Sequence, residues 1–384
     1  SALRERLGLP RWVVIAERDN ELPVDLDNRL TVDSFVNLVR GQKSAILFEL
    51  FPAPDELGVH GPDGRYAHEL QLFYAKPGTK PHVAPRPRPQ PIPRSMPPGS
   101  EWLFVKYYTG FAMCDAVLRE LGPALRELID SRAAERWFFV RYVDPEWHLR
   151  LRVAGAPDAL LSRVLPRLQQ VMKPYLDAGV VWKSQLDTYE REIERYGGAR
   201  AMELAERVFA ADSDAVVSII EAYPADEGAE LTWRAALIGL DRMLDDLGFE
   251  FPAKRKLITE LRDDFGREVG MDTDFQKRLG EKFRRQRADI EGALAITAES
   301  AGPLAPTLAA FARRSAVIRP IGVELRALHA TGELTEPVDS IARSYLHMQC
   351  NRVFAAAPRA QELVLYDLLR RYYDGVAARQ KAAK

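Results

Sequence analysis

The sequence holds little cysteine and no long apolar run. Its two cysteines, Cys114 and Cys350, are far apart, and neither lies in a CxxC or Cys/His spacing that would hold a metal ion. We interpret both as buried thiols of a protein in a reducing cytoplasm. No stretch approaches the roughly 18 apolar residues of a membrane span, and no charged-then-apolar leader opens the chain. The sequence therefore predicts a cytoplasmic protein without a membrane span.

A strong net charge and the common cofactor motifs are also missing. The formal net charge is -1, so no global positive field would attract nucleic acid, and direct tRNA binding is not expected of this chain. It has no Walker loop, no G-x-S-x-G elbow, no HExxH pair and no dinucleotide fingerprint. We therefore expect no cofactor and no metal site.

The 384 residues, 47% of them hydrophobic, suffice for two or three domains with their own cores. The sharpest boundary is residues 77–98, where proline takes nine of 22 positions. Such a run cannot build a helix or donate regularly to a sheet, so it predicts an extended linker. Residues 1–76 are few for an independent α/β domain, so we interpret them as the end of one. Their predicted elements are strands over 12–16, 45–51 and 66–74 and a helix over 32–40 with Thr31 as its cap.

Residues 99–384 form the other predicted unit, which begins with a sheet. Apolar alternation and helical periodicity give the order β-α-β-β-α-β. The strands are predicted over residues 102–108, 136–143, 147–153 and 180–189, and the helices over 111–129 and 157–176. This is the order of a ferredoxin-like unit, an antiparallel sheet covered by helices on one face.

From Gly198 onward the pattern is helical almost throughout. The expected helices span residues 199–223, 229–247, 253–269, 273–294, 303–331, 337–354 and 358–378. The fold class is therefore α+β, in which a helical bundle follows the sheet and a partial α/β segment precedes it.

Basic residues gather in the string EWHLRLRV, residues 146–153. Strand alternation places His148, Arg150 and Arg152 on one face and the apolar residues between them on the other. Arginine holds carboxylates and phosphates well, because its planar fork donates two parallel hydrogen bonds. Two arginines on one face therefore predict an anion site. The alternative is that both belong to the solvated face of an amphipathic strand.

The string SYLHMQCNRVF, residues 344–354, places a histidine on a predicted helix. His347 and Asn351 stand four residues apart and share one side of that helix. Histidine titrates near neutrality, so His347 is a candidate general acid or base. The alternative is a core or capping role, which is commoner for a lone helical histidine. Asn351 and Arg352 favour the functional interpretation, because they add polar groups to an otherwise apolar helix.

The segment DTYEREIERYGG, residues 187–198, is also rich in charged residues. Acidic and basic side chains at these spacings can satisfy one another, which favours a salt-bridged corner between a strand and a helix. The pair Gly197-Gly198 permits positive φ and close backbone approach. The alternative is that this corner directs Arg191 back toward the sheet.

Taken together, these strings resemble the C-terminal part of a lantibiotic dehydratase, a tRNA-dependent enzyme that dehydrates serine and threonine in ribosomally made peptides. Four strings resemble the glutamate-elimination domain of that family: EWLFVKYY, ERWFFVRYVDPEWHLRLRV, QLDTYEREIERYGG and YLHMQCNRVF. The string LPRWVVIAERDNELPVDLDN, residues 9–28, resembles the closing stretch of the preceding glutamylation domain. The resemblance covers nearly the whole chain, and the strings follow the family's order.

The resemblance implies three segments and a reaction. Residues 1–76 would be the remnant of a glutamylation domain, residues 77–98 a linker and residues 99–384 the glutamate-elimination domain. The domain would expel glutamate from a glutamylated serine or threonine and leave dehydroalanine or dehydrobutyrine. By position, the catalytic residues would be Arg150, Arg152, Arg191 and His347. His148, Asn351 and Arg352 would bind substrate.

The resemblance also implies partners. These are a glutamylated precursor peptide and a glutamylation domain or subunit, and a homodimer is plausible for this family. Because only the tail of the glutamylation domain is present, the chain reads as a truncated product or as one half of a split system.

Two other functions compete with elimination. Relatives in thiopeptide pathways join two dehydroalanines in a cycloaddition that forms a pyridine. Such a reaction has no glutamate to expel, so the full set of arginines argues against it. The chain could also be a non-catalytic module whose arginines grip an acidic peptide, which predicts binding without turnover.

Overall fold

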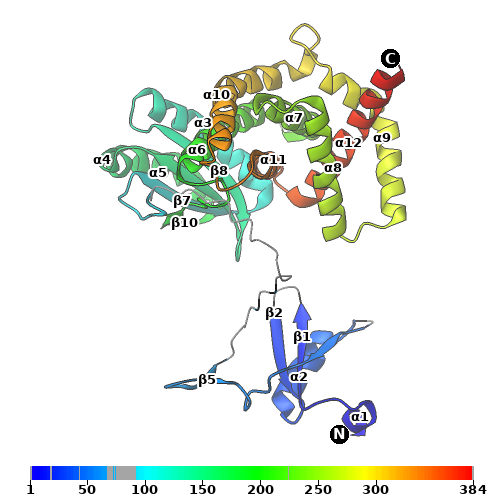
Figure 1. Cartoon of the computed structure of the whole chain (residues 1–384). Coiled ribbons are helices and arrows are strands. Elements are labelled where there is room, and N and C mark those ends of the chain that lie inside the picture. The colour runs from blue at the N-terminus through cyan, green and yellow to red at the C-terminus, as the bar shows by residue number, and fades with distance from the viewer. Residues whose placement is uncertain are drawn as a thin grey trace. The chain divides into compact units, whose positions relative to one another are not determined.

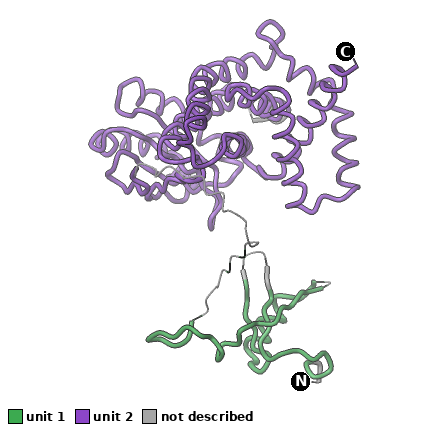
Figure 2. The backbone as a smooth tube through the Cα atoms, viewed as in Figure 1, with its two compact units in different colours: residues 1–82 green, residues 83–384 purple. Residues whose placement is uncertain are grey.

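Two compact units make up the chain in the computed structural model, residues 1–82 and residues 83–384 (Figure 2). The structure describes residues 2–17, 20–42, 44–66, 72, 74, 92–223 and 225–382. Most of the predicted linker, residues 77–91, therefore lies outside the described residues. The boundary between the units lies between residues 82 and 83.

The first unit is a small sheet with one longer helix. Its elements are α1 (Ala2–Leu7), β1 (Trp12–Glu17), β2 (Asn20–Asp25), α2 (Arg29–Val39), β3 (Leu47–Glu49), β4 (Val59–Gly61) and β5 (Gly64–Tyr66). The strands of the larger sheet lie in the antiparallel order β2-β1-β3. Among the described residues, Val13, Ile15 and Val24 form a small buried core cluster in this unit.

Two of the predictions for this unit need correction. Helix α2 begins before Thr31, because Asn28 is its N-cap and the Asn28 side chain accepts a hydrogen bond from the Leu30 amide. Thr31 lies inside the first turn, where its hydroxyl donates to the Asp25 carbonyl at 2.7 Å. Strand β3 is shorter than the predicted 45–51. The strand predicted over 66–74 falls largely on residues 67–71 and 73, outside the described residues, and β5 ends at Tyr66.

A four-stranded antiparallel sheet opens the second unit. Its elements are β6 (Ser95–Met96), β7 (Trp102–Thr109), α3 (Cys114–Asp130), β8 (Arg136–Val143), β9 (Trp147–Ala154), α4 (Pro157–Ala159), α5 (Leu165–Asp177), β10 (Val181–Asp187) and β11 (Tyr189–Glu190). The sheet has the order β10-β7-β9-β8, and short strand β11 pairs with β6 beside it. Strand β9 therefore lies inside the sheet, and β8 forms one edge.

Helices follow the sheet and complete the unit (Figure 1). They are α6 (Ala199–Ala222), α7 (Ala225–Asp246), α8 (Phe251–Glu268), α9 (Thr273–Leu294), α10 (Ala305–Ala330), α11 (Val338–Val353) and α12 (Pro358–Ala382). Each matches a predicted helix within a few residues, because apolar residues recur at helical spacing. The α+β fold class is confirmed.

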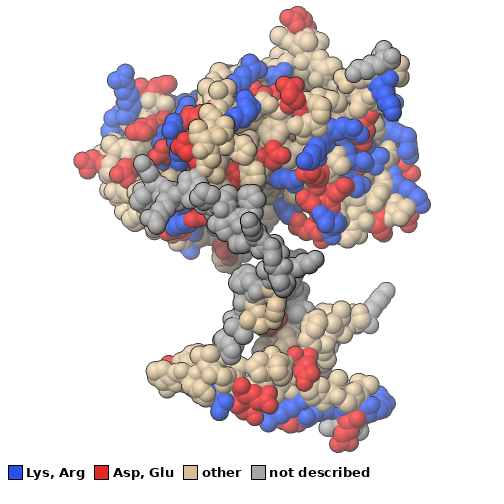
Figure 3. Space-filling model, viewed as in Figure 1, with Lys and Arg blue, Asp and Glu red and all other residues tan. Residues whose placement is uncertain are grey.

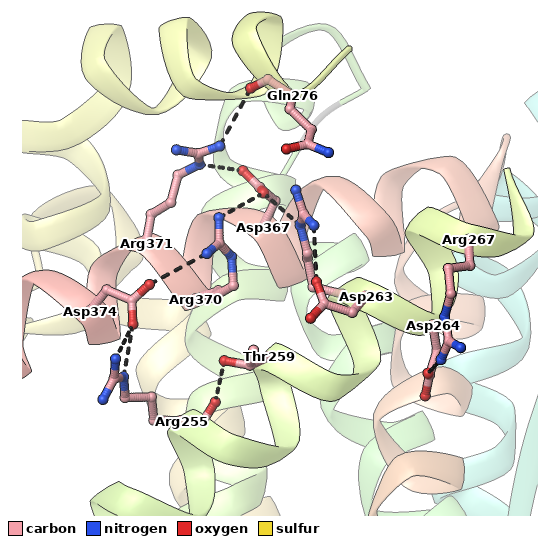
Figure 4. Close-up of polar contacts among 11 residues, drawn as sticks. Arg255, Thr259, Asp263, Asp264, Arg267, Gln276, Asp367, Arg370, Arg371 and Asp374 are labelled. Atoms are coloured by element: carbon pink, nitrogen blue, oxygen red, sulfur yellow. Dashed lines mark hydrogen bonds and ion pairs between the residues drawn. The ribbon is translucent and has the colours of Figure 1, made fainter. Parts of the chain in front are cut away.

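The helical part contains its own buried charge cluster. Asp367 of α12 is fully buried, and its carboxylate accepts from Arg262 at 3.1 Å and Arg371 at 2.5 Å. Arg370 lies 3.5 Å from the same carboxylate (Figure 4). These contacts join α12 to α8. Because Arg371 also donates to the Gln276 carbonyl, they reach α9 as well.

Charges of both signs are interspersed on the visible surface of the second unit (Figure 3). Among the residues that the structure describes, every helix is too short or too polar to cross a lipid bilayer. Within the same described residues, no group of three or more His, Cys, Asp and Glu side chains is arranged to hold a metal ion.

Candidate functional site

The predicted basic face exists on strand β9. Cross-strand register places Arg152 between Phe104 of β7 and Phe138 of β8, and Arg150 between Lys106 and Val140. Because side chains alternate across a strand, all of these residues lie on one face of the sheet. The apolar residues between them on β9 face the opposite side and belong to the core.

Arg152 lies in an aromatic cage and is only 9% exposed. The centre of its guanidinium is 4.4 Å from the ring of Phe104, 5.3 Å from that of Phe138 and 4.7 Å from that of Tyr189. Aromatic faces attract a guanidinium through their negative quadrupole. The alternative that Arg152 belongs to a solvated strand face is therefore wrong.

The guanidinium of Arg152 has no carboxylate partner in the described part of the chain. It forms no hydrogen bond or ion pair there, and its Nε is buried without an acceptor. Burial lowers the pKa of Arg152 to about 10, so the group still carries its charge at neutral pH. A buried charge without a counterion is costly. The arrangement therefore suits a bound anion.

Arg150 is held by its neighbours on the same face. Its Nε donates to His148 Nε2 at 3.0 Å, and its guanidinium lies 3.4 Å from the centre of the Tyr142 ring. His148 is fully buried, with its Nδ1 2.8 Å from the Glu146 carbonyl. Nδ1 must therefore carry the imidazole proton, because Nε2 accepts a hydrogen bond from Arg150. Burial lowers the pKa of His148, which favours this neutral form.

Lys106 and Lys183 also stand on this side of the sheet. Lys106 forms an ion pair with Asp187 of β10. Lys183 lies 4.6 Å from the centre of the Tyr108 ring. Lys106 is therefore already paired, whereas Arg150, Arg152 and Lys183 have no carboxylate partner among the described residues, and of these three Arg152 is the buried one.

Arg191 reaches this site through other side chains. Its fork is bidentate on the buried Glu206 of α6, with distances of 2.7 Å and 3.0 Å. The Tyr189 hydroxyl donates to the same carboxylate at 3.1 Å, while the Tyr189 ring forms part of the Arg152 cage. Gly197 and Gly198, with φ of 89° and 107°, turn the chain from this corner into α6. Glu206 therefore neutralises Arg191 and holds the Tyr189 hydroxyl. Arg152, by contrast, has no carboxylate partner among the described residues.

Replacing Glu206 should test this arrangement. Burial raises the pKa of Glu206, and Arg191 opposes that rise. Glu206→Gln leaves a buried guanidinium without its counterion, so we expect a loss of about 3–5 kcal/mol in the free energy of unfolding. Urea denaturation of the two proteins measures it. A variant as stable as the parent would mean that the Arg191 pair does not hold the corner in place.

Asn351 and Arg352 cover the free edge of β8. The Asn351 amide exchanges two hydrogen bonds with the Arg141 backbone, of 3.0 Å and 2.8 Å, as a neighbouring strand would. Arg352 donates from Nε to the Phe139 carbonyl at 3.1 Å. These bonds dock α11 against the sheet, so their polar atoms are used inside the protein.

Arg352 also belongs to a buried ionic network. Its Nη1 lies 3.0 Å from Asp212 of α6, and Arg314 of α10 lies 2.8 Å from the same carboxylate. Arg314 further donates to Gln349 at 2.9 Å. All of these side chains are buried. The network therefore joins α6, α10 and α11 beside the edge of the sheet.

Removing the Asn351 amide should loosen α11. Asn351→Leu leaves the Arg141 N–H and C=O without partners, and each unsatisfied buried group costs about 1–3 kcal/mol. We expect a total loss of about 2–6 kcal/mol and faster hydrogen exchange at the Arg141 amide. Exchange followed by mass spectrometry measures this. Unchanged exchange at Arg141 would show that Asn351 does not cover that edge.

His347 faces α12. Its Nδ1 lies 2.8 Å from Glu362 Oε2, and its side chain is 28% exposed. Tyr366, one turn further along α12, donates to the other oxygen of Glu362 at 2.7 Å. Within the described residues, no hydrogen bond or ion pair joins His347 to Arg150 or Arg152. The structure therefore gathers the basic residues of β9 and places His347 in a separate group.

An aromatic cluster connects these two groups of residues. Phe138, in the Arg152 cage, lies 5.3 Å from Phe209 of α6, and Phe209 lies 6.1 Å from Tyr345 of α11, measured between ring centroids. Tyr196 stacks on Tyr345 at 6.0 Å. Phe209 therefore contacts both Phe138 of the cage and Tyr345 of the helix that carries His347.

Sequence reasoning missed the carboxylates that orient this site. Glu206 and Glu362 are fully buried and bind the predicted residues Arg191 and His347. Each lies on a different helix or strand from its partner, so no local spacing could indicate it. The aromatic residues Phe104 and Phe138 alternate with predicted core positions, and only the register shows that they flank Arg152.

Comparison with known proteins finds one family model and several relatives. The family described as lantibiotic biosynthesis dehydratase, C-terminal, matches residues 102–373. The subtilin biosynthesis protein SpaB of Bacillus subtilis is 26% identical over 364 residues, which cover 93% of this chain and 34% of SpaB. The chain thus spans about a third of the length of this relative.

Two solved structures are similar in fold. The tRNA-dependent lantibiotic dehydratase MibB from Microbispora sp. 107891 has a TM-score of 0.61 and 20% identity, with 99% of this chain and 38% of that chain covered. The pyridine synthase TbtD from thiomuracin biosynthesis has a TM-score of 0.55 and 17% identity, with 72% of this chain and 99% of that chain covered. The family model spans well over half of the sequence, and the chain therefore belongs to the lantibiotic dehydratase C-terminal family.

Proposed function

We propose that this chain expels glutamate from glutamylated serine or threonine of a ribosomally made precursor peptide. The reaction breaks the Cα–H bond and the Cβ–O bond of the ester. It forms the Cα=Cβ bond of dehydroalanine or dehydrobutyrine and releases glutamate as a carboxylate. The observation that carries the proposal is the buried guanidinium of Arg152, which lacks a carboxylate partner among the described residues.

Arg152 and Arg150 would hold the glutamyl group in this reaction. A leaving carboxylate gains charge as the Cβ–O bond breaks, and a fixed cation in a site of low dielectric stabilises that charge strongly. The aromatic cage keeps water from Arg152, and His148 holds Arg150 in place. We propose that His148 acts through Arg150, because both of its ring nitrogens already have partners.

His347 would move a proton in the same reaction. Its Nδ1 is bound to Glu362, while Nε2 has no hydrogen-bond partner among the described residues. His148 lacks such a free nitrogen. A histidine near the reacting carbon can accept or donate a proton at neutral pH.

Three residues would position the site without contacting the substrate: Arg191, Asn351 and Arg352. We propose that Arg191 fixes Tyr189 through Glu206, and that Asn351 and Arg352 dock α11 on β8. The Arg191 fork, the Asn351 amide and two of the three guanidinium nitrogens of Arg352 are engaged inside the protein, which favours positioning over contact with the substrate. This revises the direct roles expected from the sequence.

We also propose the identity of the segments. The chain order β7-α3-β8-β9-α5-β10 and the antiparallel order β10-β7-β9-β8 support a ferredoxin-like sheet in the elimination domain, residues 99–384. Residues 1–76 would be the end of a glutamylation domain. Large apolar side chains on that unit are exposed, among them Leu30, Ile46 and Phe51, which supports a segment built to pack on further polypeptide.

A single assay tests elimination. The whole chain is incubated with a chemically glutamylated peptide, without tRNA, and mass spectrometry follows the loss of glutamic acid. We expect a dehydrated peptide to accumulate. The same protein incubated with a peptide that carries two dehydroalanines tests pyridine formation. Binding of the glutamylated peptide without turnover in either assay would favour a peptide-binding module and contradict the proposal.

A further inference from the structure

Glu362 is a fully buried acidic residue with an unusual set of partners. Its Oε2 lies 2.8 Å from His347 Nδ1, and its Oε1 accepts from the Tyr366 hydroxyl at 2.7 Å. Within the ranges that the structure describes, no arginine or lysine forms an ion pair with it. Its polar contacts are therefore made with one imidazole and one phenol.

The other buried acidic residues of the described chain are each paired with arginine. The pairs are Asp25 with Arg11, Glu206 with Arg191, Asp212 with Arg314 and Arg352, Asp246 with Arg319, and Asp367 with Arg262. Arginine satisfies a buried carboxylate best, because its charge is permanent and its fork matches both oxygens. If Glu362 served stability alone, we would expect an arginine there too.

We propose that Glu362 is a positioning residue for His347, an inference that rests on the proposed elimination activity. An ionised carboxylate accepts hydrogen bonds and cannot donate them. In the proposed pairing His347 donates from Nδ1 to Glu362 Oε2, which leaves the lone pair on Nε2. Because the His347 side chain is 28% exposed, Nε2 is the nitrogen available to a substrate.

Tyr366 fixes the carboxylate in this orientation. Burial raises the pKa of Tyr366 well above its ordinary value, so the hydroxyl stays protonated and remains a donor. It occupies Oε1 of Glu362 and leaves Oε2 to the imidazole. Glu362 and Tyr366 stand four residues apart on α12, one turn from each other, so the helix sets their spacing.

The tautomer of His347 can be measured directly. In full-length protein labelled with ¹⁵N-histidine, long-range ¹H–¹⁵N spectra distinguish the Nδ1–H and Nε2–H forms, and His347→Asn identifies the signals. We expect the Nδ1–H form in the wild type. In Glu362→Gln, which offers both an acceptor and a donor, that preference should be lost. The elimination rate should then fall about ten- to hundredfold, as when an orienting partner is removed elsewhere.

Asp367→Asn is the matched control. Asp367 is an equally buried carboxylate on α12, but its partners are Arg262, Arg370 and Arg371 (Figure 4). Below the unfolding temperature of each variant, Asp367→Asn should leave the His347 tautomer unchanged. A wild type in the Nε2–H form overturns the inference without any variant. So does a Glu362→Gln protein that keeps both tautomer and rate.

The His347 tautomer and the elimination rate together distinguish a failure of this inference from a failure of the proposed function. If the wild type eliminates no glutamate but Glu362→Gln still changes the His347 tautomer, the proposed activity fails and the positioning role stands. If the wild type eliminates glutamate and Glu362→Gln changes neither readout, only the positioning role fails.

Discussion

His347→Asn should lower the rate of glutamate elimination by about 10²–10⁴-fold, the range expected when a general acid or base is lost. Asparagine can still bond to Glu362 but cannot exchange a proton near neutral pH. The variant should bind glutamylated peptide and convert almost none of it. Rapid-quench mass spectrometry with saturating peptide measures the rate of the chemical step.

A second helical histidine provides the control for this experiment. His329 lies in the last turn of α10, and its exposed side chain has no hydrogen-bond partner among the described residues. His329→Asn should retain the wild-type rate. If His347→Asn also eliminates at the wild-type rate, His347 has no part in the mechanism.

Arg152→Met should lower kcat/KM for elimination by about 10²–10³-fold, as the loss of one preorganised donor does in other enzymes. Its effect on the free energy of unfolding should be small, although the replaced side chain is large and buried. Methionine fills similar volume, and the variant removes a buried charge that has no counterion among the described residues. We therefore expect the free energy of unfolding to stay within about 1 kcal/mol of the parent or to rise.

Arg352→Met is the matched variant for this contrast. Arg352 is equally buried and also lies beside an aromatic ring, 5.0 Å from the centre of Phe209, but it is paired with Asp212. Its loss should cost about 3–5 kcal/mol of unfolding free energy. If the two variants lost stability alike, Arg152 would be a structural residue, and the proposed anion site would lose its basis.

Local patterns predicted the elements of the fold well. Strand β8 has the predicted bounds, residues 136–143, and helix α9 the predicted 273–294, because period-2 and period-3.6 apolar spacing is strong in both. The cap of α2 was predicted at Thr31 and lies at Asn28, since several residue types can cap a helix and only the backbone selects one.

The candidate site was predictable only in part. Alternation within one strand sufficed to place Arg150 and Arg152 on one face. It could not indicate that Arg152 is buried while Arg191 is neutralised, because that depends on Glu206 and Tyr189. Those contacts form only when the corner after β11 packs on α6, and local sequence does not encode such packing.

The helix α11 illustrates the same limit. Its sequence places His347 and Asn351 on one side, which favoured a shared role. In the structure Asn351 bonds to the Arg141 backbone of β8, whereas His347 bonds to Glu362 of α12. One face of a helix can thus contact two different neighbours.

Elimination as proposed requires the Arg152 face to bind the glutamyl group while His347 stands at the reacting carbon. The most direct measurement is a crystal structure of the full chain with a peptide that carries glutamate on 2,3-diaminopropionate through an amide, which cannot be eliminated. We predict a glutamyl carboxylate or carbonyl oxygen within hydrogen-bond distance of the Arg152 guanidinium. His347 Nε2 should lie within about 3.5 Å of the α-carbon or its amide neighbours. A glutamyl group bound away from Arg152, or a His347 ring remote from the α-carbon, would contradict the account.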